Sequence, residues 1–377
     1  MGRFSFTEEQ EAFRRVLRRF MEDRSPSAEV RRLMATEAGW ERRHWTEMSR
    51  ELGLPAVHIP EDYGGMGYGF AELGIVLEEM GRALYCAPYF ASTVLAATAI
   101  LNAGSEEQKG TLLPSLASGE TVATLAFAED NGRWDAGGVG LTATESGGGY
   151  RLNGAKSFVP DGHTADLIVV LARAPGSAGD DGLSFLTAAG EAAGLSRRAL
   201  KTADQTRKLA RLEFRDVEAT LLGAAGGAAA PLARTLTQAA VCLANEMVGG
   251  AERLRQDTLA YTELRVQFGR AIASFQAIKH RSADMLVDVE LAKSAAYYAA
   301  AAADEDDEEL PALASLAKAS ASEAYMQTAI AAVQLHGGIG FTWDNDTHLW
   351  FKRAKSSEVF LGTPSQHREL MLQHWKI

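Results

Sequence analysis

Cysteines are few and long apolar runs are absent in this 377-residue chain, and its basic residues are fewer than its acidic ones; each of these features disfavours a class of protein. Two cysteines, Cys86 and Cys242, cannot form the disulfide framework of a small secreted domain, which favours a reducing, cytoplasmic location. No stretch approaches the roughly 18 consecutive apolar residues that a membrane-spanning helix needs. The first residues also lack the apolar core of a signal peptide.

Acidic residues outnumber basic ones. The chain has 38 lysine and arginine residues against 49 aspartate and glutamate residues, so its formal net charge is −11. This balance disfavours general binding to nucleic acids or anionic membranes, and an anionic ligand would need a local basic pocket. The remaining composition, 46% hydrophobic and 23% charged, is that of a globular protein long enough for two or three domains.

The first third of the chain has helical periodicity. Thr7 and Gln10 have the spacing of a capping box, and apolar residues then recur at helical intervals from Phe13 to Phe20. Two more amphipathic patterns follow, AELGIVLEEMGRAL and ASTVLAATAILNAG, and the turn-rich PEDYGGMGYG lies before the first of them. We therefore predict an N-terminal helical domain over residues 1–120.

Around residue 121 the pattern changes to short β-branched segments separated by glycine and aspartate, which predicts a compact antiparallel β-domain over residues 121–222. The predicted strands lie within 121–130, 140–145, 150–159, 166–174, 183–189 and 210–219. LLGAAGGAAAP then predicts a linker closed by Pro231, and alanine-rich helical segments fill residues 223–377. The acidic run from Asp304 to Leu310 predicts a solvated loop between two of these helices. The expected fold class is α+β, mainly α.

Six motifs spread over nearly the whole chain resemble those of acyl-CoA dehydrogenases: PEDYGG, LEEMGRAL, LNGAKSFV, ELRVQFGRAIASFQAIKH, QLHGGIGF and VFLGT. The resemblance implies that family's fold, with a helical domain, a middle β-domain and a C-terminal four-helix bundle. It also implies a tetramer built as a dimer of dimers, with FAD between subunits and an electron-transfer flavoprotein as redox partner. The implied reaction is α,β-dehydrogenation of an acyl-CoA, in which a glutamate removes the α-proton while the flavin accepts hydride.

The resemblance assigns one set of residues to the half of the flavin site that a chain lends to its neighbour's cofactor. The members are Arg265, Phe268, Gly269, Gln276, Gln334, Gly337 and Gly338. In the family the arginine reaches the cofactor's pyrophosphate, and the glycines let the backbone approach its adenosine side. Taken alone, HGGIGF is more simply explained as a helix–helix turn with glycines at positive φ, and no strand precedes it as a Rossmann fingerprint requires. With Arg265 and Gln276 also present, we predict cofactor contact.

The half that a chain keeps for its own flavin departs from the family pattern. In AEDNGRWD, Glu129 and Asp135 remain, but Ala128 and Trp134 replace the threonine and serine that the family uses for hydrogen bonds to the cofactor. In KSFVP, Pro160 replaces the threonine expected beside flavin N5, and proline offers neither a side-chain oxygen nor a backbone N–H. Pro160 is also compatible with a plain strand-end residue.

The catalytic glutamate of the family is missing. Its position in VFLGT is Leu361, and the alternative position used by some members falls on Ala239, with Ala240 beside it. We therefore assign no catalytic residue, and we predict no metal site. Three other residues are weaker candidates for the general base. Glu246 lies about 10 Å along the helix from Ala239, Glu358 is expected on the surface beside Lys355, and His367 is expected to be structural or exposed.

Three interpretations follow from this pattern. The favoured one is a non-catalytic subunit of a heteromeric (α2β2) acyl-CoA dehydrogenase, because the losses fall on one half-site and spare the half lent to a partner. GRWD, KSFVP and GTPSQHR resemble the actinobacterial branch that degrades sterol side chains. The second is a self-sufficient homotetramer with a displaced base. The third is a flavin-dependent oxygenase or a non-enzymatic scaffold with the same fold.

Overall fold

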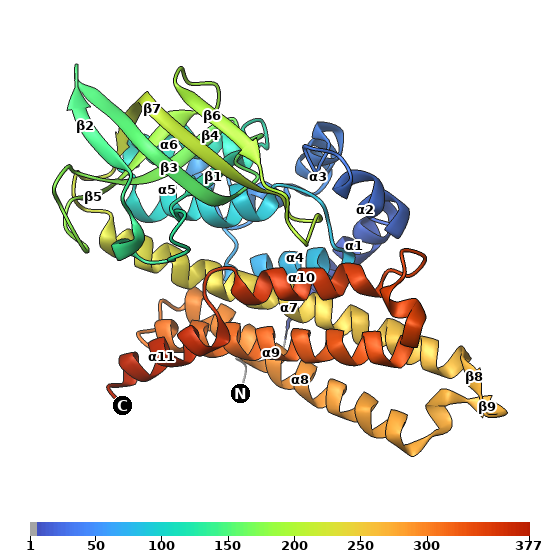
Figure 1. Ribbon diagram of the computed structural model, residues 1–377. Helices are drawn as coiled ribbons and strands as arrows, with labels where there is room; N and C mark the ends of the chain where they lie inside the picture. Colours follow the sequence, from blue (N-terminus) through green and yellow to red (C-terminus); the bar gives the residue numbers. More distant parts are fainter. Residues whose placement is uncertain (1–5) are drawn as a thin grey trace. The chain divides into compact units, whose positions relative to one another are not determined.

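The computed structural model describes residues 6–377 (Figure 1). The chain divides into two compact units. The first unit combines the described residues up to Arg31 with Gly69–Tyr85 and Ala240–Ile377. The second combines Arg32–Tyr68 with Cys86–Ala239. Helix α7 (Ala229–Leu264) runs from the second unit into the first. The domain boundaries predicted near residues 120 and 222 stay predictions.

The first unit is helical. Its helices are α1 (Glu8–Arg24), α4 (Phe70–Ala83), the C-terminal part of α7, α8 (Gln276–Asp304), α9 (Leu310–His336), α10 (Thr347–Val359) and α11 (Pro364–Trp375), and α2 (Ser27–Met34) spans the boundary between the units. In Figure 1, α9 runs alongside α8 and α10, and these helices form the predicted C-terminal bundle. The capping box predicted at Thr7 is present, since Thr7 and Gln10 exchange side-chain and backbone hydrogen bonds.

Two glycines allow α4 and α7 to cross at backbone contact. A Cβ on Gly81 would lie 2.0 Å from the Glu246 carbonyl oxygen, and a Cβ on Gly249 would lie 1.9 Å from that of Glu78. Any larger residue would therefore push the two helices apart. The close crossing brings Glu246 and Glu78, which are both buried, into the interior of the unit, where each needs a partner.

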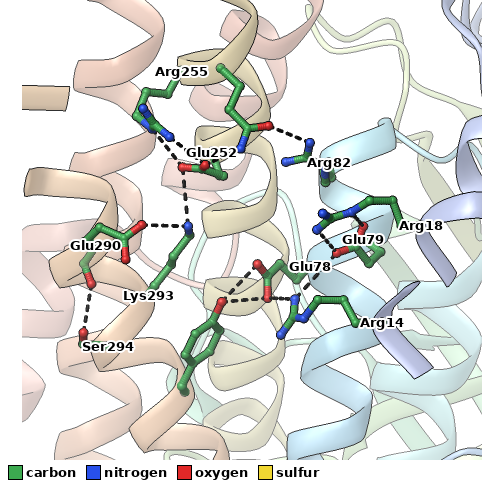
Figure 2. Close-up of polar contacts among 12 residues, drawn as sticks. Arg14, Arg18, Glu78, Glu79, Arg82, Glu252, Arg255, Glu290, Lys293 and Ser294 are labelled. Carbon is green, nitrogen blue, oxygen red and sulfur yellow. Dashed lines mark hydrogen bonds and ion pairs between the residues drawn. The ribbon is translucent and has the colours of Figure 1, made fainter. Parts of the chain in front are cut away.

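Glu246 is paired with Arg353 of α10. Glu78 belongs to a set of polar contacts that joins α1, α4, α7 and α8 (Figure 2). Arg14 of α1 donates to Glu78 at 2.5 Å, and Arg18 donates to Glu79 at 2.7 and 3.0 Å. The Tyr297 hydroxyl of α8 also donates to Glu78, at 2.9 Å. A second group of contacts surrounds Glu252 of α7, which accepts hydrogen bonds from Arg255 and Gln256 and forms an ion pair with Lys293. Burial alone would make these charges costly, so the pairing positions α1 against the bundle.

The acidic loop between α8 and α9 is present where the sequence predicted it, because α8 ends at Asp304 and α9 begins at Leu310. The acidic run was predicted to be solvated, but Asp304 also makes structural hydrogen bonds. Its carboxylate accepts the backbone N–H groups of Phe70 and Ala71 and so caps the N-terminus of α4. Within residues 6–377, no helix combines the length and the apolar character needed to cross a bilayer.

The second unit places short helices beside a sheet. Its helical segments are α3 (Arg42–Leu52), the 3₁₀ turns η1 (Leu54–Ala56), η2 (Glu61–Tyr63) and η4 (Ala136–Gly138), the π-helix η3 (Phe90–Ala97), α5 (Thr98–Ala103) and α6 (Glu106–Ala117). The predicted helix over 91–104 is thus π-helical in its first part, with every residue of η3 buried. The sequence could not distinguish a π-helix from an α-helix here, because a fully buried helix of either type contains a continuous run of apolar residues.

The sheet contains β1 (Ala123–Ala126), β2 (Thr142–Ser146), β3 (Gly149–Pro160), β4 (Leu167–Arg173), β5 (Leu183–Ala189), β6 (Leu195–Ala199) and β7 (Leu209–Leu222). The order is β1-β4-β2-β3-β7-β5, and the β4–β5 pairing closes the ladder on itself around an apolar core. Most ladders are antiparallel, as predicted, but β4 pairs in parallel with β1 and at one position with β2. The long connection through the β2–β3 hairpin allows the parallel β1–β4 pair. β6 escaped prediction because LSRRA lacks β-branched residues.

Candidate functional site

The hairpin between α7 and α8 carries the first predicted cofactor contacts. β8 (Val266–Gln267) pairs with β9 (Arg270–Ala271), so Phe268 and Gly269 form the turn. Their φ values are +51° and +78°, as a two-residue turn with both central residues left-handed requires. Glycine tolerates this conformation, but phenylalanine does not adopt it without strain. Phe268 is nevertheless 92% exposed, so this residue combines a strained backbone conformation with a large apolar side chain in contact with solvent.

A stacked aromatic pair joins the hairpin end of α7 to the glycine turn after α9. The rings of Tyr261 and His336 stack with centroids 4.2 Å apart, and the Tyr261 hydroxyl donates to the His336 carbonyl at 3.3 Å. Tyr261 lies one helical turn before Arg265, and His336 immediately precedes Gly337. The pair therefore brings the Arg265 segment and the glycine turn η6 (Gly337–Phe341) to the same end of the first unit.

The other predicted contacts lie on the same surface and are exposed. Gln276 is the first residue of α8, and Gln334 lies in the last turn of α9, two residues before His336. Both side chains are exposed, as are Gly337 and Gly338. We name this surface the hairpin surface and define it by the seven predicted residues: Arg265, Phe268, Gly269, Gln276, Gln334, Gly337 and Gly338.

The packing and backbone conformation of the chain do not require glycine at position 338. A Cβ built at this position meets no atom within 4 Å, and its φ is not in the left-handed region. Glycine in a helical segment nevertheless costs roughly 0.5–1 kcal/mol relative to alanine. A glycine that the chain's own packing does not require is typical of a place where something outside the chain approaches the backbone closely.

We expect Gly338→Ala to leave the free energy of unfolding of the isolated chain unchanged, or to raise it by about 0.4–1 kcal/mol. Denaturant titration measures this, with Gly249→Ala as the matched control. Gly249→Ala should destabilise strongly, because its Cβ would lie 1.9 Å from the Glu78 carbonyl. A large loss of stability in Gly338→Ala would show that the chain's own fold requires this glycine.

In the second unit, the segment 128–135 is fixed by bonds within the chain. Glu129 Oε1 accepts from Lys156 Nζ at 2.8 Å and from the backbone N–H groups of Gly140 and Leu141, each at 2.9 Å. The Lys156 side chain is fully buried and also donates to the Phe127 carbonyl at 3.0 Å. Burial lowers the pKa of Lys156 to about 8, although the Glu129 carboxylate raises it. Glu129 and Lys156 therefore hold the segment together rather than face a ligand.

Two further features occupy this segment. Trp134 is half-buried, and its ring lies 5.7 Å from that of Phe127. Asp130 accepts from Ser157 of β3 and from Arg211 of β7, and the Ser157 hydroxyl, followed by Arg211, lowers the pKa of Asp130. This cluster was not apparent from the sequence, because only the β3–β7 pairing brings Arg211 to the other two residues.

Pro160 is buried at the end of β3, as a strand-end residue, and its carbonyl accepts from the Thr124 hydroxyl at 2.6 Å. Proline removes one backbone donor here, and the residue contributes no side-chain oxygen. Phe158, two residues earlier, has φ +57° at an irregularity in the β3–β7 register. The strand thus keeps its place in the sheet while offering no hydroxyl at position 160.

The loop after α10 places an apolar side chain at the position of the expected base. Leu361 is buried and has φ +61°, and Gly362 follows with φ +108°. Lys318, which is itself fully buried, donates to the carbonyls of Gly362 and Glu358 at 3.1 and 3.3 Å. These bonds hold the loop in a defined conformation, so it keeps its shape without a carboxylate at position 361.

His367 is bonded on both ring nitrogens. Nε2 lies 3.0 Å from the Leu361 carbonyl, which can only accept, so Nε2 carries the proton. Nδ1 then accepts from the Ser315 hydroxyl at 3.3 Å. Burial, followed by the charge of Lys318, lowers the pKa of His367 to about 4. His367 is therefore a neutral, structural histidine, which is one of the two roles that the sequence led us to expect.

The two carboxylates considered as substitutes are both engaged in ion pairs. Glu358 accepts from Lys355, as predicted. Glu246 is buried and accepts from Arg353 of α10 at 2.8 Å. Ala239 and Ala240 are buried on α7. None of the candidate positions among residues 6–377 therefore presents an unpaired carboxylate.

Three family models match consecutive parts of the chain. The N-terminal, middle and C-terminal domains of acyl-CoA dehydrogenase match residues 7–120, 124–217 and 226–375. The chain is 32% identical to "Acyl-CoA dehydrogenase IpdE2" of Mycobacterium tuberculosis, over 98% of each chain.

Two solved structures are similar over nearly the full length. A chain from a variant of the "Tcur3481-Tcur3483 steroid ACAD" is 29% identical, covers 98% of each chain and has a TM-score of 0.87. A chain of the ChsE4-ChsE5 complex from Mycobacterium tuberculosis is 28% identical, covers 99% of this chain and 98% of that one, and also has a TM-score of 0.87.

Proposed function

Because the chain belongs to the acyl-CoA dehydrogenase family of FAD-dependent oxidoreductases, we propose that it is the non-catalytic subunit of a heteromeric acyl-CoA dehydrogenase. In this role it lends the hairpin surface to a cofactor held mainly by a homologous subunit. That subunit supplies the catalytic glutamate, the hydroxyl near flavin N5 and the acyl pocket. The assembly would be α2β2.

The observation that carries the proposal is Leu361. A general base must reach the proton that it removes, and an alkyl side chain cannot accept one. The loop around Leu361 is nevertheless held by Lys318 and His367, so the position has a defined structure in which leucine replaces the carboxylate. The neighbouring candidates Glu358 and Glu246 are already paired with cations.

The hairpin surface fits a phosphate-bearing cofactor such as FAD. Among the described residues, Arg265 has no ion pair or side-chain hydrogen bond, so its guanidinium is available to a phosphate. Gly337 and Gly338 leave open space above the backbone, and Gln276 and Gln334 present exposed amides. Arg265 would hold the pyrophosphate, and the glycines would lie against the adenosine side. When bound, FAD supplies the electron sink for the oxidation.

The half-site that the chain would keep for its own flavin also supports the role of a non-catalytic subunit. Ala128, Trp134 and Pro160 offer no hydroxyl where the family pattern has one, and Glu129 is bonded within its own segment. These losses therefore fall on one half-site, while the residues of the other half remain exposed. An obligate pairing with a homologous subunit leaves this asymmetry, because each chain then needs only one half.

The names of the similar structures support a proposal for the substrate class and the partner. One of their names describes a steroid dehydrogenase, and both name two components. We therefore assign a sterol-derived acyl-CoA as the substrate of the complex and a homologous chain as the partner. An electron-transfer flavoprotein would accept the electrons.

Flavin content tests this proposal. Absorbance of the purified protein should give little or no flavin per chain when it is expressed alone. Co-expression with a homologous subunit that has the glutamate should give a mixed tetramer with about one flavin per two chains, since each flavin would use one half-site of each kind. One flavin per chain in the isolated protein would refute the half-site role.

Arg265→Ala should lower the flavin content of the mixed complex by about tenfold or more at limiting FAD, because a charged hydrogen bond to phosphate is worth roughly 1.5–3 kcal/mol. The chain should stay folded, since Arg265 is exposed and its side chain has no partner among the described residues. Circular dichroism checks the fold, and absorbance measures the flavin. An unchanged flavin occupancy would remove Arg265 from the site.

A further inference from the structure

Residues 265–281 form a basic segment in an acidic protein. They include Arg265, Arg270, Lys279 and Arg281, with no aspartate or glutamate between them, although the whole chain has a net charge of −11. None of these four cations has an ion pair or a side-chain hydrogen bond within residues 6–377. The contrast with the network in Figure 2 is clear, because Arg14, Arg18, Arg255 and Lys293 each contact a carboxylate there.

Two of the unpaired arginines share one face of the hairpin. Gln267 pairs with Arg270, and Val266 pairs with Ala271. The Ile272 N–H donates to the Arg265 carbonyl at 2.8 Å, which continues the ladder by one step. Because side chains alternate along a strand, Arg265 lies on the same face as Gln267 and therefore as Arg270. Diagonal neighbours in such a hairpin lie roughly 7–8 Å apart. Like charges on neighbouring residues of one face repel each other, and an anion bound between them would offset this repulsion.

Arg270 is held in place by an aromatic ring. Its guanidinium carbon lies 4.1 Å from the centroid of Phe275, and Phe275 in turn makes an edge contact with Phe268 at 6.1 Å. A cation over an aromatic face gains roughly 0.5–1 kcal/mol at an exposed site, which restricts the side chain without neutralising its charge. Arg270 is therefore positioned but still able to bind an anion.

Lys279 extends this charge onto α8. It lies three residues after Gln276, so both side chains are on the same face of the helix. Phe275 provides no side-chain cap to the N-terminus of α8, and the first turn contains no acidic residue. Cations near a helix N-terminus are unfavourable, because the helix dipole is positive there. The local arrangement therefore costs stability that a bound anion would restore.

We propose that Arg270 and Lys279 join Arg265 in binding the diphosphate of the FAD that the partner subunit holds. The diphosphate carries two negative charges and several acceptor oxygens, which suit two guanidinium groups and an ammonium group. The proposal rests on the half-site role proposed above and adds two binding residues to it. Arg281 is excluded, because it lies five positions after Gln276 on the helix, which turns its side chain about 140° away from that of Gln276.

The test uses inorganic pyrophosphate as the probe and the full chain without a partner. Isothermal titration at low ionic strength should detect binding to the wild type and to Arg281→Gln with similar dissociation constants. Arg270→Gln and Lys279→Gln should each weaken binding by about 10-fold or more. Arg281→Gln removes the same charge from the same exposed helix and is therefore the matched control. Unchanged melting temperatures would show that all variants fold.

Equal weakening in all three variants would overturn the proposal, because it would indicate only a general loss of positive charge. No binding by the wild type, or no change in Arg270→Gln, would also overturn it. Arg270→Lys adds a further check, since it keeps the cation and should retain most of the pyrophosphate binding.

The outcomes separate this inference from the half-site role. If pyrophosphate binding follows the expected pattern but the isolated chain purifies with one flavin per chain, the half-site role fails and the diphosphate site stands. If the mixed complex has one flavin per two chains but Arg270→Gln and Lys279→Gln behave like Arg281→Gln, the half-site role stands and this inference fails.

Discussion

Purified alone, the chain should oxidise acyl-CoA thioesters at least about 10³-fold more slowly than the mixed complex, because a positioned general base contributes roughly 10²–10⁴-fold by itself. In the proposed half-site role the isolated chain would also lack a complete cofactor site. Steady-state turnover with an artificial electron acceptor measures this, with straight-chain and sterol-derived acyl-CoA substrates. Turnover by the isolated protein at a rate comparable to that of the complex would show that a base and a complete flavin site exist within one kind of chain.

Restoring the carboxylate should not restore the activity. In Leu361→Glu the loop keeps its bonds from Lys318 and His367, so a glutamate would enter a structured position. Trp134 and Pro160 would still offer no hydroxyl to the chain's own cofactor half-site. Leu361→Gln is the matched control for the change in size and polarity. A fully active flavoprotein from Leu361→Glu alone would contradict the account of the damaged half-site.

The second large effect concerns stability. Glu129→Ala should lower the free energy of unfolding by about 3–5 kcal/mol, because it leaves the Lys156 ammonium without its carboxylate in the interior. It also removes the acceptor for the N–H groups of Gly140 and Leu141. Denaturant titration measures the change. Glu120→Ala, an exposed carboxylate in the same unit, is the control and should stay within about 0.5 kcal/mol of the wild type. A similarly small effect of Glu129→Ala would show that the Lys156 charge is already lost in the folded state.

Lys156 also predicts the pH dependence of stability. Burial lowers the pKa of Lys156 to about 8 in the folded chain, whereas an unfolded lysine has a pKa of about 10.4. Between these values the unfolded chain binds the extra proton, so the free energy of unfolding should rise with pH, by at most about 1.4 kcal/mol per unit. Lys156→Met lacks this group, and the difference between the two proteins should change across that window. Parallel curves would contradict the prediction.

The sequence was most informative where a pattern is local or where motifs are numerous. Thr7 and Gln10 predicted a capping box that is present, because the residues that form it are three apart. The acidic run predicted the loop between α8 and α9 for the same reason. The family followed from six motifs in a fixed order, and matches across all three domains confirm it.

Features that depend on distant residues could not be predicted from the sequence. The parallel β1–β4 pair and the closed ladder depend on strand order, which local patterns do not specify. LSRRA forms β6 only because β7 is there to pair with it. Asp304 was expected to be solvated, and its role as the cap of α4 depends on a helix far away in the chain. The seven residues of the hairpin surface stay a predicted binding site.

The sequence by itself determined which side chains this protein lacks. No arrangement of the fold can give Leu361 a carboxylate or Pro160 a hydroxyl, because covalent structure sets what a residue can donate or accept. Only the tertiary structure decided which of the remaining charged groups are available. Glu246, Glu358 and Glu129 all have the right chemistry in the sequence, and packing pairs each with a cation. Arg265, Arg270 and Lys279 have no such partner in the described part of the chain, because the hairpin and the start of α8 place them where no carboxylate of these residues reaches.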